Sequence, residues 1–205
     1  NTLNGDGLLN TDTPSREEPD VFVYNPLFPV PTRGGGLCCD PGFMAPGVYD
    51  QRDIEARPDV LVYTTSPLTK ETEVTGPVTV TLHASTSAKD TDFTAKLVDV
   101  HPNGYARNLT DGIIRARYRH TRQAASLITP NEVVEYTIDL WATSNLFKAG
   151  HRIRLEISSS NFPRFDRNTN TGGPIGGEKS FVSALQTVYH TSSHPSHVRL
   201  AIVPR

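Results

Sequence analysis

The sequence predicts an all-β protein, a β-sandwich of the jelly-roll type, and three observations support this fold class. Apolar and polar residues alternate with a period of two in several segments, as half-buried strands do. Helical periodicity is scarce, and 15 Gly and 16 Pro supply frequent turns. Roughly eight to ten antiparallel strands with polar outer faces can hide their apolar faces by packing as two sheets, so a sandwich is expected.

Four strands are predicted from their own alternation. Residues 78–85, 134–140, 152–157 and 198–202 each have one apolar and one polar face. Further strands are expected at 60–63, 93–100, 105–109, 113–119 and 184–190, with a turn at Asn103-Gly104, where both residues tolerate positive φ. A slip of one residue would expose the whole apolar set, so we expect these side chains to face one another in the core: Val80, Leu82, Leu97, Ile138, Leu155 and Leu200.

Residues 1–58 are expected to form a linker and a long ordered loop that enters the sandwich of residues 59–205. The first 20 residues are polar and rich in turn formers. A short apolar run at 21–24 is followed by prolines at 26, 29 and 31 and by glycines at 34–36. These residues disfavour a long helix or a central strand.

Composition excludes several classes of partner. A net charge of −2 and a pI near 6.4 provide no basic field for nucleic acid. No apolar run approaches the ~20 residues that cross a bilayer, so a soluble protein is expected. Cys38 and Cys39 are adjacent, and Cα atoms about 3.8 Å apart are too close for an ordinary disulfide. Reduced thiols favour the cytoplasm. The start at Asn1, with no Met or signal peptide, suggests a piece of a longer chain.

The motifs of common enzymes are missing from the sequence. It has no Gly-x-Ser-x-Gly nucleophile elbow, no Gly-x-x-x-x-Gly-Lys phosphate loop and no His-Glu-x-x-His zinc helix. We therefore expect the chain by itself to be inactive, with no cofactor and no metal.

Two weaker patterns have a metal interpretation and a structural one. Asp90 and Asp92 suit a calcium loop, but they also suit polar turn residues before the strand that begins at Phe93. A histidine cluster is compatible with a metal site, although a solvated turn explains it better. Its members are His190, His194 and His197.

Two groups of arginines suggest binding. Arg115, Arg117 and Arg119 would lie on one face of a strand, either solvated or meeting carboxylates of another domain. The loop 161–168 combines two aromatics with two arginines. It would either bind a ligand by stacking and ion pairing or be tied to itself, and we favour the second interpretation.

The loop 26–48 is more apolar than a solvated loop requires. Its residues Leu27, Phe28, Leu37, Phe43 and Met44 are therefore candidates for an interdomain interface, left as an exposed apolar patch in this chain.

Eight segments together resemble one known family. They are 59–65 (DVLVYTT), 74–78 (VTGPV), 90–100 (DTDFTAKLVDV), 109–113 (LTDGI), 143–145 (TSN), 149–153 (AGHRI), 158–163 (SSSNFP) and 194–197 (HPSH). The chain thereby resembles the C-terminal non-catalytic domain of the X-Pro dipeptidyl-peptidase, cocaine esterase and α-amino acid ester hydrolase (glutaryl-cephalosporin acylase) family of serine hydrolases. The resemblance covers nearly the whole chain.

The resemblance implies that this domain packs on an α/β-hydrolase domain of the same parent chain, which carries the Ser-Asp-His triad. No triad residue matches a position in this sequence. In the family, the segment corresponding to 34–39 turns towards the acyl pocket, so Leu37, Cys38 and Cys39 are expected to form one pocket wall. The other interpretation of this segment is a mobile hinge.

Two rival functions belong to other classes. Galactose-binding-like jelly rolls commonly bind carbohydrate, so an independent carbohydrate-binding module is the main alternative. Such a module needs exposed aromatics, whereas the only tryptophan, Trp141, follows a buried-strand pattern and is expected inside. An autonomous enzyme with a dispersed Ser, His and Asp set is the third possibility.

Overall fold

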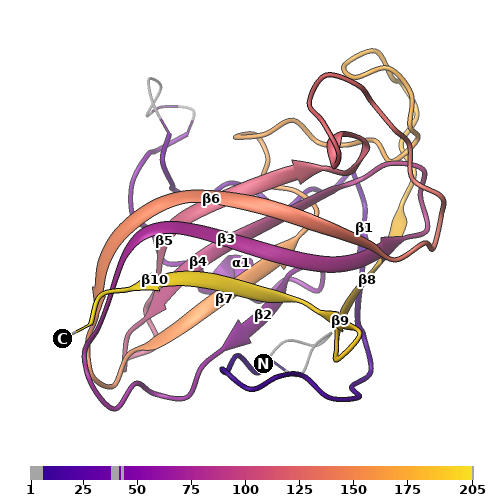
Figure 1. Cartoon of the computed structure of the whole chain (residues 1–205). Helices are drawn as coiled ribbons and strands as arrows, with labels where there is room; N and C mark the ends of the chain where they lie inside the picture. Colours follow the sequence, from indigo (N-terminus) through magenta and orange to yellow (C-terminus); the bar gives the residue numbers. More distant parts are fainter. Residues whose placement is uncertain (1–6, 38–41, 43, 205) are drawn as a thin grey trace.

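The computed structural model describes residues 7–37, 42 and 44–204, and two antiparallel sheets pack face to face in it (Figure 1). The elements are β1 (Asp20–Tyr24), α1 (Arg52–Glu55), β2 (Leu61–Thr64), β3 (Thr72–Thr86), β4 (Asp92–Val100), β5 (Ala106–Arg115), the 3₁₀ helix η1 (Ala116–Tyr118), β6 (Val134–Phe147), β7 (Arg152–Ser158), β8 (Ala184–Thr191), β9 (His194–Pro195) and β10 (His197–Ile202). The predicted β-sandwich is confirmed. None of the described helices has the length and apolar character that a membrane crossing requires.

One long strand organises the larger sheet. β6 pairs with β3 along one side, while the other side of β3 pairs first with β10 and then with β8. β1 completes the sheet by pairing with β8, and β9 extends from β8. The smaller sheet has the order β2-β7-β4-β5. The edge strands β5 and β6 pack against each other, and we call this contact the β5–β6 corner.

The core lies between the two sheets, as the alternation predicts. Five of the six expected core residues are buried in one cluster: Val80, Leu82, Leu97, Ile138 and Leu155. Leu200 packs against the cluster but is only half-buried, because β10 covers just one end of the long strand β3. The finer expectation of a galactose-binding-like jelly roll stays a prediction.

The side of the sandwich away from the β5–β6 corner is covered by the N-terminal segment. The Leu9 amide donates to the Thr64 carbonyl (3.2 Å), and the Thr64 amide donates to the Gly7 carbonyl (2.7 Å). Residues 8–15 and Glu17 line a cavity of about 790 Å³ there, together with inward-facing residues of both sheets. Because Leu9 also packs on the core, this segment is part of the sandwich.

Some predicted boundaries are wrong. β1 lies within the region expected to be linker and loop, because the run at 21–24 pairs with β8. The two strands expected at 105–109 and 113–119 are one strand, β5, which ends at Arg115. The chain then turns into η1, where the Ala116 amide donates to the Thr91 carbonyl (2.9 Å) and the Arg117 amide donates to Asp90 Oδ1 (2.9 Å). The side chain of Asp90, which alternation does not reveal, thus draws the backbone out of the sheet.

Trp141 lies at a bulge in β6, on the outer face of the strand. Pro77 pairs with Ala142 but Thr79 pairs with Asp139, so Leu140 and Trp141 together oppose a single residue of β3. Trp141 takes a left-handed φ of 66° and is 74% exposed. The expectation that it lies inside is wrong, because the strand runs on past residue 140 and the alternation that buries Leu140 places Trp141 on the outer face.

The bulge is held by β5. The Thr110 hydroxyl donates to the Leu140 carbonyl, and the backbone of Gly112 lies against the Asp139 carbonyl. A Cβ on Gly112 would meet that carbonyl oxygen at a separation that real side chains do not show. Glycine is therefore required here by the close approach of two backbones.

Replacing Gly112 by alanine should destabilise the domain strongly, since the obstacle is backbone that a rotamer change cannot move. We expect a loss on the order of 3 kcal/mol in the free energy of unfolding, measured by urea denaturation. Gly177→Ala is the matched control, because Gly177 has no positive φ and the nearest atom to an added Cβ lies at 3.8 Å. Equal unfolding midpoints for both variants would contradict the close approach.

Candidate functional site

Two glycines, Gly35 and Gly47, pair with each other beside the smaller sheet. The Gly35 amide donates to the Gly47 carbonyl (2.7 Å), and the Gly47 amide donates back to the Gly35 carbonyl (3.0 Å). Gly34, Gly35 and Gly47 have φ of 70°, 105° and 107°, which disfavour residues with a Cβ. We call residues 34–47 the glycine-based loop. Its two ends are fixed by this pair of hydrogen bonds.

A buried ion pair supports the base of this loop. Arg164 Nη1 contacts Asp111 Oδ1 at 2.5 Å, and Asn161 Nδ2 donates to Asp111 Oδ2 (2.8 Å). A Cβ on Gly35 would lie 2.8 Å from Arg164 Nη1, so the guanidinium sits directly against the loop. The Arg164 amide also donates to Thr32 Oγ1 (3.1 Å). Strand β5 therefore positions the loop through Asp111.

The predicted interface and pocket residues fall in different environments. Leu27 and Phe28 are 55% and 70% exposed, in a turn before the loop. Leu37 and Met44 are half-buried within the glycine-based loop. Cys38, Cys39 and Phe43 lie outside the described residues. The apolar side chains described here are thus not absorbed into the core, and their interface role stays a prediction.

The loop 161–168 is tied to the chain itself, as favoured from the sequence. Besides the bonds of Asn161 and Arg164 to Asp111, Asp166 Oδ1 accepts from Arg115 (2.7 Å). The Arg167 guanidinium lies 5.6 Å from the ring centroid of Phe162 and donates to the Pro26 carbonyl (3.1 Å). Its arginines therefore fasten neighbouring segments together.

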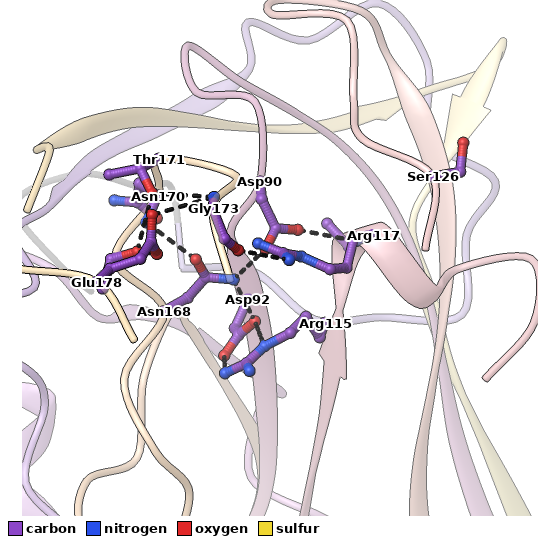
Figure 2. A network of polar contacts seen from close by, with 12 residues as sticks. Asp90, Asp92, Arg115, Arg117, Ser126, Asn168, Asn170, Thr171, Gly173 and Glu178 are labelled. Atoms are coloured by element: carbon purple, nitrogen blue, oxygen red, sulfur yellow. Dashed lines mark hydrogen bonds and ion pairs between the residues drawn. The ribbon is translucent and has the colours of Figure 1, made fainter. Parts of the chain in front are cut away.

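A second polar network lies where β4 begins and β5 ends (Figure 2). Arg117 Nε donates to Asp90 Oδ2 (2.7 Å), and Arg115 donates to both oxygens of Asp92 (2.9 Å each). Asn168 Nδ2 bridges the two carboxylates at 2.7 and 2.9 Å. Burial raises the pKa of Asp92, and the bond from Arg115 acts in the opposite direction. Two carboxylates thus share one amide and two guanidinium groups.

This network corrects the predictions for its members. Arg115, Arg117 and Arg119 do not share a strand face, because η1 begins after Arg115. Arg115 and Arg117 find their carboxylates inside the same chain, and Arg119 donates to the Ala116 and Ser126 carbonyls (3.1 and 2.5 Å). Asp90 lies in the turn before β4 and Asp92 is the first residue of that strand, as the structural interpretation expects, and both carboxylates are buried against guanidinium groups. An interdomain role for the three arginines stays a prediction.

A third charged cluster lies around α1 and the smaller sheet. Lys96 Nζ contacts Glu156 Oε2 (3.0 Å), and Arg154 Nη1 contacts Glu55 Oε2 (2.6 Å). Burial, and after it the charge of Glu156, raises the pKa of Glu55 to about 7. Glu55 is thus the member of this cluster whose charge changes near neutral pH.

One group of side chains among the described residues has the composition of a metal site: Asp99, His101 and His151. His151 Nδ1 already bonds Asp99 Oδ1 (2.8 Å), and the His101 ring stacks on the His151 ring with centroids 4.4 Å apart. The carboxylate and one imidazole therefore satisfy each other without an ion. Of the histidines singled out in the sequence, His190 binds Glu17 and Asp20, and the His194 ring contacts the His83 ring.

Comparisons with known proteins decide the family. Residues 1–199 match the model of the X-Pro dipeptidyl-peptidase C-terminal non-catalytic domain. The chain belongs to this family. The chain is 48% identical over its full length to cocaine esterase from Rhodococcus sp. (strain MB1 Bresler), and it spans 36% of that protein.

Solved structures agree with this assignment. An aminopeptidase from the marine sediment archaeon Thaumarchaeota archaeon superposes with a TM-score of 0.88 and 34% identity, covering 99% of this chain and 36% of that one. An α-amino acid ester hydrolase superposes with a TM-score of 0.89 and 30% identity, covering 98% and 36%. The chain thus spans about a third of the length of these relatives.

Arg117→Met should destabilise the domain, because it removes the charged partner of an Asp90 carboxylate that is fully buried. We expect a loss of about 3–5 kcal/mol in the free energy of unfolding, the usual cost of breaking a buried pair. In the control, Arg33→Met removes the solvent-exposed pair with Asp53 (3.9 Å) and should leave the unfolding midpoint nearly unchanged. Similar losses of unfolding free energy in both variants would show that the buried Asp90–Arg117 pair is no more costly to break than an exposed pair.

The raised pKa of Glu55 should make its contribution to stability depend on pH. The folded-state pKa of Glu55 is about 7 against an ordinary value of 4.5, so the folded protein holds this proton more tightly than the unfolded chain does. The resulting stabilisation is complete below pH 4.5 and is lost as the pH rises to about 7. Glu55→Gln cannot ionise, so its stability relative to wild type should rise over that interval by up to about 3 kcal/mol. Urea titrations of both proteins from pH 4 to 8 measure the difference. A difference that stays flat would show that Glu55 ionises normally.

Proposed function

We propose that this chain is the non-catalytic C-terminal β-sandwich of a serine hydrolase that cleaves esters, amides or X-Pro peptides. In this proposal it packs on an α/β-hydrolase domain of the same parent chain and supplies one wall of the acyl pocket through Leu37, Cys38 and Cys39. The family and the esterase and aminopeptidase relatives support the class of reaction. Relatives about three times as long leave ample chain for a catalytic domain.

The geometry of the glycine-based loop is the observation that carries the pocket-wall role. The ends of this loop are hydrogen-bonded to each other and its base rests on the Asp111–Arg164 pair, so the points where it leaves and rejoins the domain are fixed, as a specificity element requires. Its described apolar residues, Leu37 and Met44, are only half-buried by the rest of the chain. A hinge would not need the buried ion pair beneath it.

The alternative, an independent carbohydrate-binding module, gains one argument from the structure. Trp141 is exposed, and sugar platforms use exposed aromatic rings. The family assignment and the esterase relative favour the hydrolase domain. The two functions differ in what covers Trp141, which is a protein domain in the hydrolase and a sugar in the carbohydrate-binding module.

The test of the proposed function is acyl-chain specificity in the full-length parent enzyme. Cys38→Phe and Cys39→Phe should each alter the ratio of kcat/KM between long and short acyl p-nitrophenyl esters by about 10- to 200-fold, since they change the volume of a pocket wall. Val182→Phe, at an exposed position outside the loop, is the control and should leave the ratio unchanged.

Two outcomes contradict the proposal. An unchanged ratio in both cysteine variants, with folding intact, would remove the pocket-wall role. Saturable ester hydrolysis by the 205-residue chain alone, abolished by a single Ser→Ala change within it, would show that the domain is itself catalytic.

A further inference from the structure

Building on the proposed function, we infer that Trp141 anchors the surface on which the catalytic domain of the parent chain packs. Trp141 is the only tryptophan in the sequence and is 74% exposed, the highest exposure among the large hydrophobic side chains that the structure describes. Tryptophan is enriched among the few residues that dominate binding energy at interfaces. An exposed position of this kind therefore fits an anchor that lacks its partner.

The backbone at Trp141 is strained in a way that the isolated domain does not need. Its φ of 66° lies in the left-handed region, where a bulky residue is an outlier and glycine is at ease. The conformation is held by the Trp141 amide, which donates to Asp139 Oδ1 (2.8 Å), and by Thr110 and Gly112 from β5. The fold thus fixes the direction of a side chain that makes no contribution to its own core.

The bulge that carries Trp141 and the base of the glycine-based loop both contact β5. Gly112 of β5 lies against Asp139, two residues before Trp141. The neighbouring residue, Asp111, holds Arg164 beneath Gly35 of the loop. β5 and β6 are edge strands of the two sheets, and they run close together in Figure 1. One strand, β5, thus positions both the proposed pocket wall and the exposed tryptophan.

The catalytic domain is the occupant that this arrangement favours. If the loop reaches the acyl pocket of that domain, the corner beside the loop must lie near the same domain. About two-thirds of the length of the cocaine esterase relative lies outside the region that matches this chain, so a partner large enough to cover the corner is available in such a protein. A sugar would explain the exposure of Trp141 but not why the same strand, β5, contacts its bulge and supports the loop.

Hydroxyl-radical footprinting read by mass spectrometry tests the inference directly. Trp141 should be oxidised readily in the 205-residue chain and several-fold more slowly in the full-length parent enzyme. Equal oxidation in the two proteins would overturn the inference. A parent that lacks hydrolase activity would instead contradict the proposed function, so the two failures are distinguishable.

Trp141→Gly supplies a second test, in which the expected change in Tm differs between the 205-residue chain and the full-length parent. In the 205-residue chain, glycine suits the left-handed backbone, so the Tm should be equal to or above that of wild type. In the parent, loss of the anchor should lower the Tm and speed thermal inactivation. Asn131→Gly is the matched control, an exposed residue with φ of 67° that should behave alike in both proteins.

Each other result counts against the anchor. A lower Tm in the 205-residue chain would make Trp141 a structural residue of the sandwich. An unchanged Tm of the parent enzyme carrying Trp141→Gly would show that nothing packs on Trp141. Saturable quenching of Trp141 fluorescence by galactose, lost in Trp141→Gly and accompanied by equal oxidation in the parent, would assign the surface to carbohydrate.

Discussion

The two sheets meet backbone to backbone at the β5–β6 corner, and the functional features of the domain depend on that contact. Gly112 allows the approach, and the Thr110 hydroxyl satisfies the Leu140 carbonyl. The same few residues of β5 contact the bulge at which Trp141 takes its left-handed φ, and they include Asp111, which binds the arginine beneath the glycine-based loop. A single close contact in the scaffold therefore sets the position of two surface elements that are far apart in the sequence.

Buried charge fixes the long connections. Apolar packing explains how the strands are arranged but does not specify the path of loops such as 161–168, which have little regular structure. That path is set by carboxylates that accept from arginine and asparagine at defined angles, as Asp111 and Asp92 do. Such pairs add little net stability over an apolar core, but each is costly to break, so alternative loop positions are disfavoured.

The sequence predicts the sandwich because burial on one face leaves a period-two signature that each strand carries by itself. Residues 152–157 and 184–190 are therefore placed within one residue of β7 and β8, whereas β4 is buried along its whole length and shows no alternation of burial. The charged networks leave no such signature. Asp90 and Arg117 are 27 positions apart and Arg164 and Asp111 are 53 apart, so neither pair is apparent before the chain is folded. The expectation for Trp141 is wrong because β6 continues past residue 140, so the alternation that buries Ile138 and Leu140 places the next residue on the outer face.

The pairing of β1 with β8 constrains how this domain can be made. Asp20 of β1 lies opposite Val188 of β8, and these residues are separated by most of the chain. β8 in turn attaches to the far end of β3, beside β10. Contacts between distant segments form slowly, because the intervening chain must be ordered first. During synthesis on the ribosome the larger sheet cannot be completed until its last strands have emerged, so the unpaired edges of β1 and β3 must be kept from other chains until that moment.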